Sequence, residues 1–253
     1  MTELIVQNVY FEAGDAALVE DASFRLAKGE FVALLGPNGA GKTSLIRASL
    51  GLEVPTSGRA MLDGEDTTAL APNSRARQLA YLPQIRPLAW PNTVRDVVAL
   101  GRFSHGAALG RLKEADAGAV DRAIAACDLT ALAHRSADTL SGGELARMHC
   151  ARAFAAEAPL LIADEPTAAL DPRQQFRILD LIAEFVGRGG GALVVLHDIA
   201  MAARYASRLI WMKQGGILAD GPPSETLTAD RLEEIYGVRA TIYGDRMHMD
   251  GPL

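Results

Sequence analysis

The stretch that most restricts how this chain can fold is "GPNGAGKTS", residues 36–44. It follows a continuous apolar run, "FVALL", and precedes the helical pattern "SLIRASLGL". A glycine-rich turn between a buried strand and a helix, ending in Gly41, Lys42 and Thr43, is the P-loop pattern in the context that it needs. Backbone N–H groups in such a turn surround an anion, and the helix N-terminus reinforces them. The stretch therefore predicts a phosphate-binding loop in an α/β fold.

The same pattern predicts different tasks for the residues of this loop. Lys42 is expected to hold the β- and γ-phosphates of a nucleotide, and Thr43 to be a Mg²⁺ ligand. A side chain at Gly39 or Gly41 would keep the backbone away from the phosphate. The whole set expected to bind the nucleotide is Gly36, Pro37, Asn38, Gly39, Ala40, Gly41, Lys42, Thr43 and Ser44. A glycine-rich turn without a ligand is the alternative interpretation.

Further apolar runs have the same character as "FVALL": "LAYL" (79–82), "LLIA" (160–163) and "ALVVL" (192–196). Continuous rather than alternating runs are typical of strands buried on both faces of a mainly parallel sheet. The residues of interest that follow these runs are Gly36, Gln84, Asp164 and His197. Because ligands bind outside the carboxyl ends of the strands in open α/β sheets, we expect these residues to lie along one edge.

The polar residues after these strands have the chemistry of phosphoryl transfer. Asp164 is expected to bind Mg²⁺ directly or indirectly, and Glu165 to orient and deprotonate the attacking water. Gln84 is a candidate ligand of Mg²⁺ or of the water, and His197 a donor to the γ-phosphate. The alternatives are two acids that simply end a strand and a structural histidine. No role is assigned to the histidines without acidic or cysteine neighbours at metal-ligand spacing, which are His105, His134, His149 and His248.

Composition argues against several other classes of protein. A net charge of -6 and a pI near 5.4 are not those of a general nucleic-acid binder. Cys127 and Cys150 lie in alanine-rich, helix-like surroundings, which favours buried free thiols over a disulfide or a metal site. The start, "MTELIVQNVYFEAGD", has early acids and no long apolar core, so a signal peptide is not expected. No run reaches about 18 uninterrupted apolar residues, so no membrane span is expected.

Patterns on either side of the motifs predict the rest of the organisation. Alternation and turn residues before Gly29 predict antiparallel strands beside the core sheet, and amphipathic patterns between 85 and 157 predict a helical insertion. A hairpin is expected in "RLIWMKQGGILADG", and a helix in "TADRLEEIYG", between Thr228 and Gly237. We therefore expect one domain over residues 1–253. Its catalytic α/β core would comprise 1–84 and 158–253, and its helical subdomain 85–157.

"LSGGE" (140–144) opens one of these helices. Ser141 is a good N-cap, and Glu144 completes a capping box. The glycines between them are poor helix formers, at about 1 kcal/mol each relative to alanine. A hydroxyl, bare amides and a positive dipole end make a second anion site. We therefore expect Ser141, Gly142 and Gly143 to bind phosphate, with a helix start that has accidental glycines as the alternative.

Together these motifs resemble those of a known family. "GPNGAGKTS", "LPQ", "LSGGE", "LLIADEP", "AALD" (168–171) and "LHD", in this order and spacing, resemble the nucleotide-binding subunit of ABC transporters over nearly the whole chain. The resemblance implies ATP as the bound nucleotide, Gln84 in the Q-loop and Asp171 in the D-loop. It also implies Glu165 as catalytic base and His197 as the residue that senses the γ-phosphate. Two copies would meet head to tail, each ATP lying between one P-loop and the other chain's Ser141.

Two segments resemble one branch of importers. "TVRDVVALGRFSHG" (93–106) and "LTADRLEEIYGVRATI" (227–242) are similar to ATPases of iron-siderophore, haem and cobalamin uptake. This implies a peripheral ATPase on the cytoplasmic face of the inner (plasma) membrane, with a transmembrane permease as partner, a substrate-binding protein as indirect partner and no nucleic acid. Gln84 to Trp90 and the helix after Thr93 are expected to receive the permease. The alternatives are a soluble ABC ATPase of repair or translation, and the ATPase of a metal-ion importer or an exporter.

One position departs from the family pattern. The aromatic residue that usually precedes the glycine of the N-terminal strand loop, and stacks on adenine, is replaced by Ala13 before Gly14. Tyr10 or Phe11 is the candidate to reach the base instead. We expect weaker stacking to lower base selectivity before it lowers turnover.

Overall fold

The computed structural model describes residues 2–14, 16–84, 92–107, 111–243 and 246–252. The chain divides into two compact units. One unit comprises Met1–Leu70 and Gly191–Leu253, and the other comprises Ala71–Gly190. The predicted boundaries of a catalytic core and a helical subdomain follow the motifs, and they remain a prediction.

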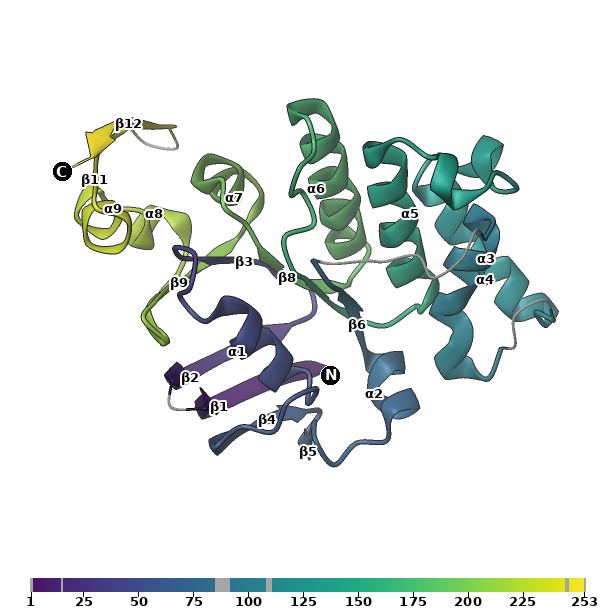
Figure 1. The fold of residues 1–253 in the computed structure, drawn as a ribbon, viewed down its shortest axis with the longest axis horizontal. Coiled ribbons are helices and arrows are strands. Elements are labelled where there is room, and N and C mark those ends of the chain that lie inside the picture. The colour runs from purple at the N-terminus through teal and green to yellow at the C-terminus, as the bar shows by residue number, and fades with distance from the viewer. Residues whose placement is uncertain (1, 15, 85–91, 108–110, 244–245, 253) are drawn as a thin grey trace. The chain divides into compact units, whose positions relative to one another are not determined.

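An antiparallel sheet forms much of the N-terminal part of the first unit (Figure 1). It contains β1 (Glu3–Ala13), β2 (Ala16–Ala27), β4 (Ser57–Leu62) and β5 (Glu65–Asp66), in the order β2-β1-β4-β5. Leu4, Val6 and Val9 are buried along β1, and the irregular step between Val6 and Val9 contains Asn8 at φ 47°. The expectation of antiparallel strands before Gly29 is confirmed.

The second group of strands in this unit surrounds β3 (Phe31–Leu35). β3 is parallel to β8 (Gly191–Val195) on one side and to β9 (Arg208–Lys213) on the other, and β10 (Gly216–Gly221) is antiparallel to β9. All residues of β3 and β8 are buried, which explains why their sequences are apolar without alternation. The helices α1 (Lys42–Ser49) and α7 (Ile199–Tyr205) follow β3 and β8.

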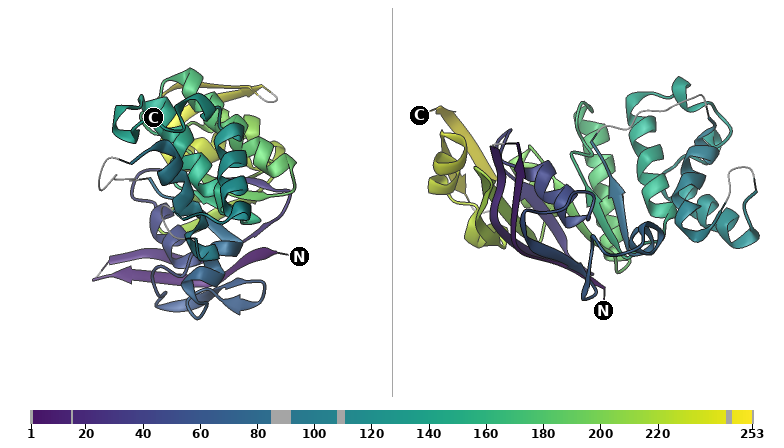
Figure 2. Two further views of the ribbon diagram at one scale, coloured as in Figure 1. Left: turned by 90° about the vertical axis from the view of Figure 1, so that its right-hand side faces the viewer. Right: turned by 60° about the horizontal axis from the view of Figure 1, so that its bottom comes forward.

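The C-terminal end of this unit contains α8 (Pro223–Thr226), α9 (Ala229–Tyr236) and the hairpin of β11 (Val238–Tyr243) and β12 (Arg246–Pro252) (Figure 2). The side chain of Thr228 accepts a hydrogen bond from the Arg231 backbone N–H, and Gly237 ends α9 at φ 65°. The caps of α9 and the hairpin of β9 and β10 agree with the sequence-based predictions.

The second unit is built from helices around a pair of parallel strands, β6 (Leu79–Leu82) and β7 (Leu160–Ala163). Its elements before β7 are α2 (Pro72–Gln78), α3 (Val94–Ala99), η1 (Leu100–His105), α4 (Glu114–Ala126), η2 (Thr130–Leu132), η3 (Ala137–Thr139) and α5 (Gly142–Ala155). The long helix α6 (Pro172–Gly187) comes after β7. Between β6 and β7 the described residues form helices and turns with isolated bridges, in agreement with the helical patterns of the sequence.

The helical part has an apolar core that includes Val97, Val120 and Met148. Cys127 and Cys150 are buried free thiols, as predicted, and burial raises the pKa of the Cys127 thiol. A thiol with a raised pKa is a poor nucleophile, so Cys127 is a packing residue.

A buried ion pair fastens η1 to α4 and α5. Arg102 Nε donates to Asp116 Oδ1 at 2.9 Å, and Arg102 Nη1 donates to the Ala155 carbonyl at 2.9 Å. The neighbouring Gly101 has no room for a side chain, since a Cβ there would lie 2.2 Å from the Arg152 carbonyl oxygen. These contacts fix the segment that resembles the importer branch.

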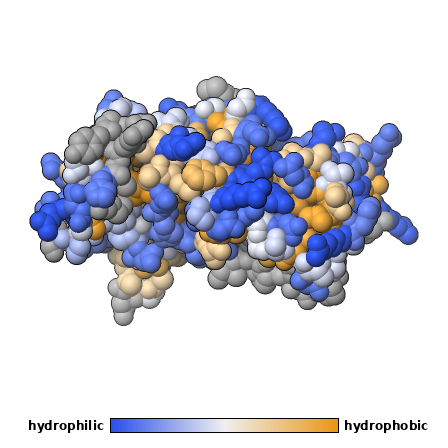
Figure 3. Space-filling view, turned by 90° about the horizontal axis from the view of Figure 1, so that it is seen from above, coloured by the Kyte–Doolittle hydropathy of each residue, from blue (hydrophilic) through white to orange (hydrophobic). Residues whose placement is uncertain are grey.

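No helix in the described ranges has the length and apolar character needed to cross a membrane. The face seen in Figure 3 carries mostly hydrophilic residues with smaller groups of hydrophobic ones between them.

Candidate functional site

The phosphate-binding loop packs closely against two strands of its own unit. A Cβ on Gly41, which has φ 93°, would lie 2.0 Å from the Leu18 carbonyl oxygen of β2. A Cβ on Gly36 would lie 2.2 Å from the Met212 carbonyl oxygen of β9. The loop is therefore fitted between the backbones of β2 and β9, and both glycines are needed for packing as well as for access to a phosphate.

The lysine of this loop folds back over it. Lys42 is 6% exposed, and its Nζ donates to the carbonyl oxygens of Gly36 at 2.7 Å and Pro37 at 2.9 Å. This places the ammonium group beside the loop, where the sequence predicted a charge for phosphates. Thr43 is exposed in the first turn of α1.

The N-terminus of α1 lacks a cap of its own. Gly41 precedes the helix, no side chain accepts a hydrogen bond there, and the first turn has no acidic residue. A helix begins with backbone N–H groups that have no partner within it, and such groups bind phosphate and other anions. The residues present therefore fit a nucleotide phosphate.

A shielded tyrosine supports the loop from the C-terminal part of the same unit. Burial raises the pKa of Tyr236 to about 12, and the nearby Gly36 backbone acts in the opposite direction; the buried hydroxyl has no well-formed hydrogen bond among the described residues. The proximity of Tyr236 to Gly36 was not predicted, because the two residues are far apart in the sequence.

His197 leaves the sheet beside the loop. β8 is paired with β3, and the Leu196 backbone N–H donates to the Leu34 carbonyl at 3.3 Å. His197 follows at the carboxyl end of β8 and is exposed, while the Asp198 side chain caps α7 by accepting from the Met201 N–H at 2.9 Å. The first unit thus brings the P-loop and His197 to the carboxyl ends of neighbouring parallel strands.

The second unit brings together a different part of the predicted site. β6 and β7 are parallel neighbours, and the Asp164 backbone N–H donates to the Leu82 carbonyl at 2.8 Å. Asp164 is fully buried. The Gln84 side chain donates from Nε2 to Glu165 Oε2 at 2.5 Å. Gln84, Asp164 and Glu165 therefore meet at one edge, as expected from the two strands that they follow.

The segment after β7 has an unusual backbone. Glu165 and Ala169 have positive φ angles, of 49° and 60°. A residue other than glycine in this conformation costs on the order of 1–3 kcal/mol. Asp171 then caps α6, with its Oδ1 accepting from the Gln174 N–H at 2.9 Å. The caps and turns hold the carboxylate of Glu165 on a strained, well-defined segment.

The start of α5 contains the capping box that the sequence predicted. The Ser141 N–H donates to Glu144 Oε2 at 2.8 Å, and the Glu144 N–H donates to Ser141 Oγ at 3.4 Å. The hydrogen bonds from the Ser141 backbone and hydroxyl lower the pKa of Glu144. Unlike the start of α1, this helix start has acceptors from its own side chains.

The glycines of "LSGGE" differ from each other in their surroundings. A Cβ on Gly142 would lie 4.0 Å from its nearest neighbour, Leu170 Cδ2. A Cβ on Gly143 would lie 2.4 Å from Gln174 Oε1 on α6. Gly143 therefore leaves room for the Gln174 side chain of α6, a contact that the sequence did not predict, whereas a side chain at Gly142 would meet no close neighbour.

The hairpin between β1 and β2 contains the position where an aromatic residue was expected. Ala13 pairs with Ala16 and is exposed, next to Gly14 at φ 61°. Phe11 pairs with Val19 and is half-buried, whereas Tyr10 pairs with Ser57 of β4 and is 40% exposed. Phe11 therefore shares a face with the buried Val19, and the choice of a residue for adenine stays a prediction.

Comparison with known proteins identifies the family. The sequence profile of the family described as ABC transporter matches residues 19–168, more than half of the chain. The chain belongs to the ABC transporter family. As an ABC transporter ATPase subunit it binds and hydrolyses ATP. All the motifs that carried the resemblance lie within or beside the matched residues except "LHD", which comes later in the chain at 196–198.

Relatives of this ABC transporter subunit include named import proteins. The hemin import ATP-binding protein HmuV of Nocardia farcinica is 44% identical over 221 residues, which cover 87% of this chain and 75% of that protein. The ferric enterobactin transport ATP-binding protein FepC of Escherichia coli is 39% identical over 233 residues, covering 92% of this chain and 86% of that protein.

Solved structures of the family have the same fold. An ATP-binding subunit of an ABC transporter has a TM-score of 0.77 at 27% identity, over 93% of this chain and 95% of that one. A dimeric ATP-binding cassette in a post-hydrolysis state with ADP and phosphate has a TM-score of 0.74 at 26% identity, over 87% of this chain and 98% of that one. The expected fold class is confirmed.

The predicted site residues of this ABC transporter subunit fall into two groups. The P-loop and His197 lie in the first unit, and Gln84, Asp164, Glu165, Asp171 and the start of "LSGGE" lie in the second. Of the segment Gln84 to Trp90, predicted to receive the permease, residues 85–90 are outside the described residues. The helix after Thr93 is α3, with a capping box between Thr93 and Asp96.

Proposed function

We propose that this chain is the ATP-hydrolysing subunit of an ABC importer, in which two copies bind two ATP–Mg²⁺ and drive a conformational change in a membrane permease. The observation that carries the nucleotide part is the uncapped start of α1, with the Lys42 ammonium group on the loop carbonyls beside it. We assign the importer class and a cargo of an iron complex, haem or cobalamin from the names of the relatives.

The P-loop of the first unit would hold the phosphates. Its backbone N–H groups and Lys42 would bind the β- and γ-phosphates, and Thr43 would present its hydroxyl to Mg²⁺. Asp164 and Gln84 would supply the other oxygen ligands, which suits a hard cation. When bound, Mg²⁺ would neutralise charge that develops on the phosphates.

Glu165 would act as the base. Its carboxylate would orient the attacking water and take its proton, and His197 would donate a hydrogen bond to the γ-phosphate. Gln84 already contacts Glu165 at 2.5 Å, so the amide can hold the carboxylate until the nucleotide is in place. Asp171, which caps α6, would contribute to ATP hydrolysis as a residue of the D-loop.

The second half of each ATP site would come from another copy of the chain. The exposed Ser141 and Gly142 would offer a hydroxyl and amides to the γ-phosphate, beside Gly143. The similarity to a dimeric cassette with ADP and phosphate supports this arrangement. ATP would then join two copies, and hydrolysis would release them.

The partners follow from the importer class. The permease would hold the subunit at the cytoplasmic face of the inner (plasma) membrane, and a substrate-binding protein would act through the permease. The net charge of -6 supports the expectation that nucleic acid is not a partner.

The Glu165→Gln variant tests the ATPase mechanism. It keeps the shape of the side chain and removes the base, so we expect an ATP-bound dimer with little turnover, measured by sizing chromatography and phosphate release. Glu233→Gln, at an exposed position on α9, is the matched control and should behave like the unaltered protein. A Glu165→Gln protein that stays monomeric with ATP would contradict the two-copy site.

Reconstitution tests the importer part. The subunit is co-expressed and co-purified with a candidate importer permease and placed in vesicles, and ATPase activity is measured with haem, a ferric siderophore or cobalamin. We expect one of these cargoes, with its binding protein, to stimulate the activity. Activity that responds to no cargo and needs no permease would instead indicate a soluble ABC ATPase.

A further inference from the structure

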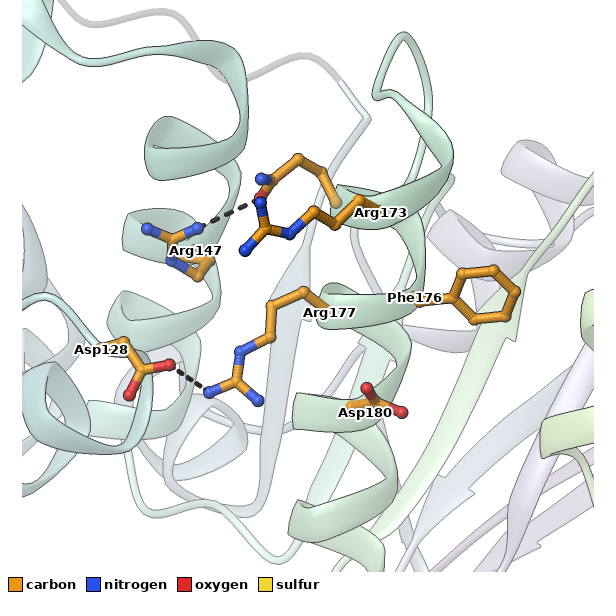
Figure 4. A pocket seen from close by; sticks show the side chains of 7 residues that line it. Asp128, Arg147, Arg173, Phe176, Arg177 and Asp180 are labelled. Atoms are coloured by element: carbon orange, nitrogen blue, oxygen red, sulfur yellow. Dashed lines mark hydrogen bonds and ion pairs between the residues drawn. The ribbon is translucent and has the colours of Figure 1, made fainter.

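A polar pocket, separate from the predicted ATP site, lies wholly within the second unit (Figure 4). Its volume is about 510 Å³, and its walls come from α5, α6 and the turn that follows α4. Three arginines line it, Arg147 from α5 and Arg173 and Arg177 from α6. Small-molecule sites have volumes of roughly 300–1,000 Å³, so the space suits a small ligand.

The helical spacing explains why these charges gather. Arg173 and Arg177 are four residues apart on α6, so their side chains lie on the same face, one turn from each other. Figure 4 shows both guanidinium groups on the side of α6 that faces Arg147. Like charges at this spacing repel each other, which an anion between the helices would relieve.

Internal partners satisfy only part of this positive charge. Arg177 pairs with Asp128. Arg147 Nη1 donates to Gln174 Oε1 at 3.1 Å, a neutral acceptor, while its Nε is shielded from solvent without a hydrogen-bond acceptor among the described residues. Arg173 forms no hydrogen bond or ion pair with any residue that the structure describes. Two of the three guanidinium groups therefore lack a carboxylate partner here.

We propose that this pocket binds a small molecule with phosphate or carboxylate groups. Guanidinium groups bind such groups through paired N–H···O hydrogen bonds, and Arg147 and Arg173 have donors to spare. None of these arginines belongs to the predicted ATP site. The binding does not depend on the importer assignment.

The pocket also borders the helix start described above. Gln174, which accepts from Arg147, has its Oε1 2.4 Å from the position that a Cβ on Gly143 would take. Its backbone N–H donates to the capping Asp171. An anion held by Arg147 and Arg173 would thus fix the Gln174 side chain, which lies between Gly143 of "LSGGE" and the backbone of α6.

The test uses the full chain with Lys42→Ala, which removes the P-loop lysine and so weakens phosphate binding at that loop. Inorganic phosphate is titrated by calorimetry at constant ionic strength, because charge interactions are screened by salt. We expect saturable binding. Adding Arg173→Gln should weaken it about tenfold, the loss expected for a charge-assisted hydrogen bond.

Two further variants separate this site from general charge effects. Arg188→Gln, at the arginine that follows the last residue of α6 and pairs with Glu184, makes the same change of charge and should leave phosphate binding unchanged. Asp128→Asn releases Arg177 from its partner and should tighten binding about threefold. A gain in affinity cannot result from loss of folding, so this variant keeps the test decisive.

The outcomes are distinct. Tricarballylate replaces phosphate in a parallel titration and shows whether carboxylates or phosphates are preferred, either of which supports the site. Absence of saturable binding to both probes would overturn the proposal. Equal losses of affinity in Arg173→Gln and Arg188→Gln would also overturn it, because they would indicate attraction by net charge alone.

Discussion

The starts of α1 and α5 are both glycine-rich, yet they meet the needs of a helix N-terminus in opposite ways. The start of α1 has no side-chain cap. At the start of α5, Ser141 and Glu144 satisfy each other's backbone N–H groups. The first start has no side chain to satisfy its N–H groups, whereas the second already has two N–H groups in internal hydrogen bonds and leaves those of Gly142 and Gly143 for a phosphate. We infer that ATP binds first through the P-loop and recruits "LSGGE" afterwards.

The largest effect is expected from Lys42→Ala at the uncapped start. The variant removes a buried charge that lies on the loop carbonyls, so ATP affinity should fall by about 100-fold or more. Binding of a fluorescent ATP analogue measures this loss. The exposed Lys28→Ala is the control, and a small effect of Lys42→Ala on affinity would show that the backbone N–H groups hold the phosphates without the lysine.

An intermediate effect is expected from alanine at the adjacent glycines of α5. Gly143→Ala should lower the melting temperature because its methyl group meets Gln174, at a cost of about 1–3 kcal/mol. The methyl group of Gly142→Ala would meet no close neighbour, so this variant should change the free energy of unfolding by less than about 0.5 kcal/mol. Its ATPase activity should fall, because the methyl group would keep the γ-phosphate away from the backbone N–H groups. A fully active Gly142→Ala protein would contradict the second anion site.

The smallest effect is expected from Ser141→Ala, which removes one cap and should cost about 1 kcal/mol. Ser141 lowers the pKa of Glu144 from its ordinary 4.5, first through its backbone and then through its hydroxyl. A carboxyl group whose pKa is lowered by folding stabilises the folded state at pH values above its ordinary pKa. This stabilisation is lost as the pH falls through the lower pKa of the folded state. The difference in melting temperature between Ser141→Ala and the unaltered protein should therefore narrow below about pH 4.5. A constant difference would mean that the Ser141 hydroxyl does not contribute to the lowered pKa of Glu144.

Local chemistry explains what could be predicted from the sequence. The continuous runs of β3 and β8, the caps at Ser141 and Thr228 and the turn at Gly237 depend on neighbours along the chain, and the structure confirms them. The meeting of Gln84 with Glu165 was accessible as well, because parallel strands end at a common edge.

Contacts between distant segments could not be predicted in the same way. A glycine pattern indicates a close approach, but not that the Leu18 carbonyl fills the space beside Gly41. The pocket lined by arginines was not predicted either, because Arg147 and Arg173 come together only when α5 packs on α6. The roles of the site residues in catalysis remain predictions, because they depend on a nucleotide and on a second copy of the chain.

The left-handed backbone at Glu165 has a consequence for how this sequence can vary. Glycine would relax the conformation at that position, and a chain selected only for a higher melting temperature would drift toward it. Retention of a carboxylate there is a compromise between a stable protein and a working one. Sequence libraries screened for thermal resistance alone should lose this residue early, and with it the turnover of ATP.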